Sequence, residues 1–198
     1  MTQSKTGSRR KIAAFVAATL VLATAAACGD LTGVPASLPT LSDSGIVYAL
    51  NGAPPGAPTA LHMFSGTLLA ADGSFIFDVA FDIDSAGNVV VLPEPAVASG
   101  LVTNHTVSLA TVPDAYDALG SAPKITYRAD TALVTKPNVT IVAQSSDPNA
   151  CGVSLTGTTL YAKIVVTSVD LVNRQLKVRF TSDPNCGFRS FSSGIPKD

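Results

Sequence analysis

The sequence of 198 residues has no tryptophan, and Glu94 is the single glutamate among its 14 acidic residues. Charged residues make up 14% of the chain, well below the usual quarter. Long surface helices use Glu and Lys, so this scarcity argues against them, and the Thr, Ser, Val, Gly and Pro that fill the gap favour strands and turns. The lack of Trp also weakens a carbohydrate-binding interpretation, because sugars commonly stack on that ring, although four tyrosines remain.

Lysine and arginine are absent between Lys11 and Lys124. Residues 28–123 hold nine acids and no base, whereas residues 124–198 hold nine bases and five acids. We interpret the halves as parts of one fold whose charges partly neutralise each other; the alternative is a bipolar surface that attracts cations or basic partners. Without residues 1–27 the chain has a net charge of −5. That charge argues against a nucleic-acid partner, since a phosphate-binding face needs clustered Lys and Arg.

Signatures of catalysis are missing as well. The two histidines are His62 and His105, and neither accompanies a Gly-x-Ser-x-Gly elbow or lies at metal-ligand spacing from another histidine. No phosphate-binding glycine loop is present, and one glutamate excludes a glycosidase with a Glu pair. The sequence therefore predicts no catalytic residue, no cofactor and no metal site. The alternative is a hydrolase whose site is assembled from distant residues, His62 or His105 among them.

The first 28 residues are the most informative part of what is present. Four basic residues and no acid precede an apolar run over residues 12–27, which is followed by Cys28; the basic residues are Lys5, Arg9, Arg10 and Lys11. As a helix, the run of 16 residues would be about 24 Å long, short of a hydrocarbon core of about 30 Å. A basic start, a short apolar segment and small residues before a cut site are typical of a cleaved export signal.

The end of this leader, Ala25-Ala26-Ala27-Cys28, resembles the lipobox of bacterial lipoproteins, with Ala25 where Leu is usual. The resemblance implies that residues 1–27 are removed and that Cys28 carries the lipid that anchors the chain to a membrane, facing the periplasm or the cell exterior. Gly29, rather than Asp, follows the cysteine, which favours the outer membrane if the host has one. Residues 8–12 also partly resemble a twin-arginine signal, but we take the general export route as the default.

The remaining chain is predicted to be a single all-β domain. Residues 28–44, which lack a clean period, are the lipidated N-terminus and a flexible tether of roughly 20–25 Å, and residues 45–198 form the domain. We expect a β-sandwich, immunoglobulin-like or similar, or a small barrel built of antiparallel hairpins, with at most one short helix, at residues 113–120. Strands are expected over residues 46–50, 61–69, 75–84, 89–92, 106–112, 124–128, 132–135, 139–144, 160–169 and 175–181.

Residues 75–84 alternate most clearly. Their odd-numbered positions are Phe, Phe, Val, Phe and Ile, which predicts a core face, and Asp78, Asp82 and Asp84 share the opposite, solvent face. Residues 82–88 partly match a calcium-binding loop, so a minor hypothesis is a cation-stabilised module that uses these three carboxylates. A polar strand face that enters a turn is the favoured interpretation.

Two cysteines remain after Cys28. In an exported chain such a pair suggests a disulfide, and Cys151 and Cys186 flank the predicted hairpin of residues 160–181, whose ends lie together. Each follows a Ser-Asp-Pro-Asn turn, which we interpret as structural. The alternative is a binding edge lined by the polar residues of both turns, Asp147, Asn149, Asp183 and Asn185.

These observations predict a lipid-anchored protein of the cell envelope that acts as a non-enzymatic binding, adhesion or structural module. Its expected partners are the membrane, through the lipid on Cys28, and an envelope protein recruited at an exposed sheet edge. The hydrolase and the cation-stabilised module remain the alternatives.

Overall fold

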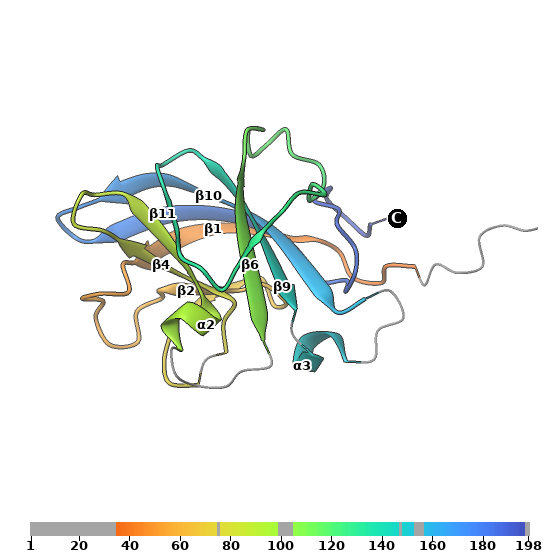
Figure 1. Ribbon diagram of the computed structural model, residues 1–198, viewed down its shortest axis with the longest axis horizontal. Coiled ribbons are helices and arrows are strands. Elements are labelled where there is room, and N and C mark those ends of the chain that lie inside the picture. The colour runs from red at the N-terminus through yellow and green to blue at the C-terminus, as the bar shows by residue number, and fades with distance from the viewer. Residues whose placement is uncertain (1–34, 75, 99–104, 147, 153–156, 197–198) are drawn as a thin grey trace, which may run out of the picture. The chain divides into compact units, whose positions relative to one another are not determined.

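The computed structural model describes residues 35–74, 76–98, 105–146, 148–152 and 157–196. Two antiparallel sheets make up the described part of the chain (Figure 1). The six-stranded sheet runs, in spatial order, β1 (Leu41–Tyr48), β11 (Gln175–Asp183), β10 (Thr159–Asp170), β9 (Thr140–Ser146), β6 (Thr106–Val112) and β7 (Arg128–Ala129). The five-stranded sheet runs β3 (Thr67–Leu69), β2 (Ala60–His62), β4 (Val79–Ile83), β5 (Val89–Pro93) and β8 (Leu133–Thr135).

The core lies between the two sheets. Alternate residues of β11, namely Leu176, Val178 and Phe180, are fully buried there in one cluster with Val79 and Phe81 of β4. Burying each such side chain contributes about 1.5–3 kcal/mol. Over the described residues neither sheet closes on itself, so the predicted all-β sandwich is confirmed and the barrel alternative is not the fold.

Residues 106–112 and the hairpin of residues 160–181 agree best with the prediction. The strand expected over residues 106–112 is β6. The expected hairpin of residues 160–181 is the pair β10–β11, joined by the predicted turn, where Asp170 accepts hydrogen bonds from the backbone N–H groups of Val172 and Asn173. The carboxylate of Asp170 thus satisfies two backbone amides of the turn and stabilises it.

The predicted helix at residues 113–120 is wrong. These residues make a single turn, in which the N–H groups of Ala118 and Leu119 both donate to the carbonyl of Ala115. The segment instead packs on the outer face of the six-stranded sheet, in a second apolar cluster that includes Leu119 and Phe191. Two four-residue helices lie elsewhere, α2 (Glu94–Val97) and α3 (Pro148–Cys151). Neither helix in the described residues has the length and apolar character needed to span a bilayer.

Two boundaries near the start of the domain also differ from the expectation. Strand β1 begins at Leu41, so the last four residues of the predicted tether belong to the sheet. The strand expected over residues 61–69 is divided into β2 and β3, and the hairpin turn lies at residues 63–66 rather than at 70–73. Gly66 has φ +60°, and a Cβ there would lie 2.8 Å from Cβ of Leu41, so a side chain would meet β1.

The predicted alternation of residues 75–84 fails at its start. Regular strand geometry begins at Val79, and Phe77 packs with Ala60 and Ala80 rather than with the core residue Phe81. Asp78 is 2% exposed, not on the solvent face that it was predicted to share with Asp82 and Asp84. The reason is a set of polar partners that lie far away in the sequence and hold Asp78 inside the protein.

The predicted disulfide is confirmed: Cys151 and Cys186 are bonded, with a Cα–Cα distance of 5.7 Å. In the turn before Cys186, Asn185 is nearly buried and its side-chain oxygen accepts hydrogen bonds from the backbone N–H groups of Ser37 and Leu38. That role is structural, as the favoured interpretation of the turn predicted. Asp147, the side chain of Asn149 and the leader with Cys28 lie outside the described residues.

Candidate functional site

A buried polar cluster links the two sheets at the end where β4 and β6 begin. The Asp78 carboxylate accepts hydrogen bonds from the backbone N–H of Met63 (2.6 Å) and the Ser145 hydroxyl (2.5 Å), and His105 Nε2 lies 3.1 Å away. His105 Nδ1 lies 3.4 Å from Oε2 of the buried Glu94. Burial raises the pKa of Asp78, but the hydrogen bonds from His105 and Ser145 outweigh it and leave the pKa below the ordinary value.

This cluster gathers the residue types of a hydrolytic triad, with Ser145 Oγ 2.8 Å from His105 Nε2 and Glu94 at the other ring nitrogen. The arrangement does not suit the reaction. Ser145 is fully buried, so no substrate reaches its oxygen, and its hydroxyl donates to Asp78 rather than to the imidazole. The other candidate, His62, lies apart from this cluster, with Nδ1 2.8 Å from the Ser65 hydroxyl in the β2–β3 turn. The cluster therefore acts as a polar clamp between the sheets.

The three carboxylates of the cation hypothesis point to different partners. Asp82 pairs with Arg174 at 3.0 Å, whereas Asp84 accepts hydrogen bonds from the backbone and side chain of Asn88 within its own turn. Asp78 belongs to the buried clamp. In the part of the chain that the structure describes, no three His, Cys, Asp or Glu side chains are grouped so as to hold a metal ion.

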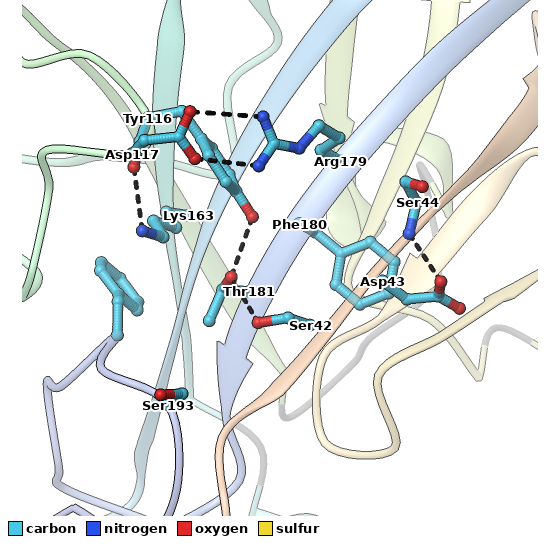
Figure 2. A pocket seen from close by; sticks show the side chains of 11 residues that line it. Ser42, Asp43, Ser44, Tyr116, Asp117, Lys163, Arg179, Phe180, Thr181 and Ser193 are labelled. Carbon is cyan, nitrogen blue, oxygen red and sulfur yellow. Dashed lines mark hydrogen bonds and ion pairs between the residues drawn. The ribbon is translucent and has the colours of Figure 1, made fainter.

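An open depression of about 500 Å³ lies on the outer face of the six-stranded sheet (Figure 2). It extends from the residue 113–120 segment across β10 and β11 to β1, with the C-terminal segment at one side. Hydroxyl groups and charged groups dominate its lining, which consists of Ser42, Asp43, Ser44, Tyr116, Asp117, Lys163, Arg179, Phe180, Thr181, Phe191 and Ser193.

Lys163 forms the floor of the depression and is 6% exposed. Its ammonium group donates to the backbone carbonyls of Tyr116 and Leu119, at 2.9 Å each, and lies 4.6 Å from the centre of the Tyr116 ring. Burial lowers the pKa of Lys163, partly offset by the charge of Asp117. Because its ammonium group is hydrogen-bonded to these carbonyls, Lys163 holds the 113–120 segment on the sheet and is not available to bind an anionic ligand.

Tyr116 and Arg179 order the rest of the lining. The Tyr116 hydroxyl bonds to Thr181 at 2.9 Å, and Thr181 bonds to the Ser42 hydroxyl at 2.8 Å, so a chain of hydroxyls leads to β1 (Figure 2). The Arg179 guanidinium lies over the Tyr116 ring and pairs with Asp117 at 2.9 Å. The two cations of the lining are Lys163, which donates to two backbone carbonyls, and Arg179, which pairs with Asp117. With Asp43 and Asp117 as its acids, the lining has balanced charge.

The side of the depression formed by β1 is an edge of the sheet. Strand β1 pairs with β11 on one side, and the N–H groups of its even-numbered residues point to the other. At the two ends these groups are already bonded: the N–H of Thr40 donates to the carbonyl of Gly194, and the N–H of Tyr48 to that of Pro58. Between them, the N–H groups of Ser42 and Ile46 have no protein partner in the described residues.

Asp43 occupies the middle of this edge. Its carboxylate accepts the outward N–H of Ser44 at 2.7 Å (Figure 2), and it takes part in none of the ion pairs found among the described residues. A charged side chain on an edge strand protects the edge against indiscriminate pairing with other strands.

Comparisons with protein-family models, curated proteins and solved structures find no match to this chain. The candidate site therefore depends on the geometry of the chain itself. The roles of Lys163 and Tyr116 and the edge position of β1 were not predicted from the sequence. The one available signal was the isolated lysine within the apolar run of residues 160–169.

Proposed function

We propose that the protein is a lipid-anchored module of the cell envelope that binds a partner, without catalysis, at the outer-face depression and the adjoining edge of β1. The observation that carries the proposal is the open edge of β1, five residues between two bonded ends, beside a polar depression. An unpaired strand edge offers a row of backbone donors and acceptors to another chain, which is a recurring mode of protein recognition.

The place of β1 in the sequence supports the link to the membrane. Strand β1 begins 13 residues after Cys28, a span of at most about 45 Å when fully extended. A lipid on Cys28 would therefore hold the candidate site within a few tens of ångströms of the bilayer surface. The basic and apolar leader and the disulfide between Cys151 and Cys186 both fit an exported protein.

The chemistry of the depression supports binding over catalysis. The hydroxyls of Tyr116, Thr181 and Ser42 bond to one another, and none of the lining residues is a histidine or cysteine. The lining thus has no imidazole base beside a hydroxyl, as a serine hydrolase requires. In the polar clamp, Asp78 and Ser145 are buried, so a substrate does not reach the serine oxygen.

Two measurements test the proposal. The intact mass of the protein from its native membranes, with and without reduction, is expected to begin at Cys28 with added lipid. A mass that begins at Met1 would refute the lipid anchor. Independently, a photo-crosslinking side chain at Ser44 is expected to capture an envelope protein, whereas the same group at Ser168, an exposed serine of β10, captures none. Equal capture at both positions would refute the assignment of the site.

A further inference from the structure

We propose that the open edge of β1 binds an extended peptide segment of a partner protein, and that Asp43 selects a segment with a Lys or Arg beside it. This inference rests on the proposed function, because it names the class of partner that the same site takes. The partner strand would extend the six-stranded sheet at its β1 edge.

The length of the accepted segment follows from the two bonded ends of the edge. Thr40 and Tyr48 donate their outward N–H groups to the carbonyls of Gly194 and Pro58, so the chain itself closes the edge at both ends. The open stretch runs from Ser42 to Ile46, about 16 Å at the rise of a β-strand. An added strand would bond there to the backbone of Ser42, Ser44 and Ile46, and a segment of five to six residues fits.

Asp43 makes the edge selective. The N–H of Ser44 can bond to an incoming carbonyl only when it releases the Asp43 carboxylate, which now lies 2.7 Å away. The released carboxylate stands at the edge without a cationic partner of its own. A basic side chain on the incoming strand would compensate the carboxylate for the lost hydrogen bond from Ser44. An acidic side chain would repel it, because like charges directly opposite each other on paired strands are destabilising.

Charge favours a separate basic partner over a second copy of this chain. Strand β1 contains no Lys or Arg, so pairing two copies through β1 would bring no cation to either Asp43. Of the cations that line the adjoining depression, Arg179 pairs with Asp117 and Lys163 donates to the carbonyls of Tyr116 and Leu119, so neither neutralises Asp43. A basic segment thus meets a complementary charge that self-pairing does not provide.

The test measures binding of the full lipidated chain, in detergent micelles, to the fluorescent peptide Thr-Val-Thr-Lys-Thr-Val-Thr by anisotropy. Two control peptides replace the central Lys with Glu or the central Thr-Lys-Thr with Pro-Lys-Pro, which removes backbone donors. We expect the Lys peptide to bind at least tenfold more tightly than either control. Equal binding of the Lys and Glu peptides, or no binding at millimolar concentration, would overturn the proposal.

Variants of the chain locate the interaction. We expect Asp43→Asn to weaken binding of the Lys peptide at least fivefold and to abolish the preference over the Glu peptide. Ser44→Pro is expected to abolish binding, and because the N–H of Ser44 points away from β11, this change keeps the existing strand pairing. The matched control is Asp72→Asn, since exposed Asp72 also caps a nearby backbone N–H, that of Ser74.

The outcomes separate this inference from the proposed function. If Asp43→Asn and Ser44→Pro bind the Lys peptide as the wild-type chain does, the proposal that β1 binds an extended peptide is overturned. The proposed function would still stand if a crosslinker at Ser44 captures an envelope protein. A concentration-dependent dimer in sedimentation that Ser44→Pro abolishes would overturn it in favour of self-pairing. If Ser44→Pro fails to fold by circular dichroism, Asp43→Asn and the Pro-Lys-Pro peptide still decide the question.

Discussion

The ammonium group of Lys163 donates a hydrogen bond to the backbone carbonyl of Leu119 across 2.9 Å. Lys163 belongs to the middle of β10, and Leu119 to a segment without regular secondary structure that lies 44 residues earlier. A second bond, to the carbonyl of Tyr116, completes the attachment. Together with the Tyr116–Thr181 and Asp117–Arg179 contacts, Lys163 therefore holds in place the wall of the depression.

Replacing Lys163 with Met tests this attachment. Met keeps an unbranched side chain but leaves the carbonyls of Tyr116 and Leu119 without their donor, so we expect a loss of about 2–3 kcal/mol in the free energy of unfolding. Urea unfolding followed by circular dichroism measures the loss. Lys177→Met, on the exposed face of β11, is the control and should change stability by less than about 0.5 kcal/mol. Equal losses in the two variants would contradict the role of Lys163.

The clamp at Asp78 is expected to contribute to stability and not to activity. Ser145→Ala removes a buried hydroxyl that donates to the Asp78 carboxylate, and we expect a loss of about 1–3 kcal/mol. The control is Ser168→Ala, an exposed serine of the neighbouring strand. Binding of the test peptide at β1 should be the same in both variants; a selective loss of peptide binding in Ser145→Ala would show that the clamp belongs to the binding site.

Acid is expected to weaken the domain through Asp78. Since its pKa is lowered in the folded state, Asp78 contributes stability that is fully present above the ordinary carboxyl pKa of about 4 and is lost as the pH falls through the lowered value. Asp183 has the opposite sign: burial raises its pKa, so its contribution is present below the ordinary value and is lost as the pH rises through the raised one.

The free energy of unfolding, measured from about pH 6 to about pH 2, separates these effects. We expect the wild-type chain to lose more stability on acidification than Asp78→Asn, whose side chain does not titrate. Some acid dependence should remain in the variant, because other carboxyls with lowered pKa stay in place, among them Asp72, Asp84, Asp117 and Asp170. Parallel profiles for the two proteins would contradict an ionised, hydrogen-bonded Asp78.

The disulfide should stabilise the domain mainly through the unfolded chain. It closes a loop of 35 residues, and the lost chain entropy corresponds to about 3–4 kcal/mol. We expect the double variant Cys151→Ala, Cys186→Ala to be less stable by about that amount in urea. Reduced wild-type protein should match the variant, and a stability equal to that of the oxidised protein would show that the bond constrains little.

Local patterns predicted the strands whose surroundings are simple. Strands β6 and β10–β11 were predicted well because they are rich in β-branched and apolar residues, and because Asp170 marks the turn between the last two. The single turn at residues 113–120 resembles a helix in composition, but its carbonyls bond to Lys163, which sequence analysis does not bring near. Apolar contacts with a sheet face replaced the helix that the local pattern favoured.

The candidate site depended on relationships that a local pattern does not contain. The alternation of residues 75–84 predicted an exposed Asp78. The residue is buried because it bonds to Met63, His105 and Ser145, which lie 15, 27 and 67 residues away and are not part of the local pattern. Nothing in Leu41–Tyr48 indicates that this strand ends a sheet, since the order of strands is a property of the whole fold. The cysteine pair was predictable because a hairpin brings its flanks together.

The contact of Asn185 with Ser37 and Leu38 has a mechanical consequence. Tension applied to the chain before Ser37 first loads the hydrogen bonds to Asn185, which lie next to the disulfide at Cys186. The tension then passes along β1. The hydrogen bonds between β1 and β11 lie across the direction of that pull, so they would be loaded together in shear rather than opened one at a time. A partner bound along β1 would share the load on the same strand.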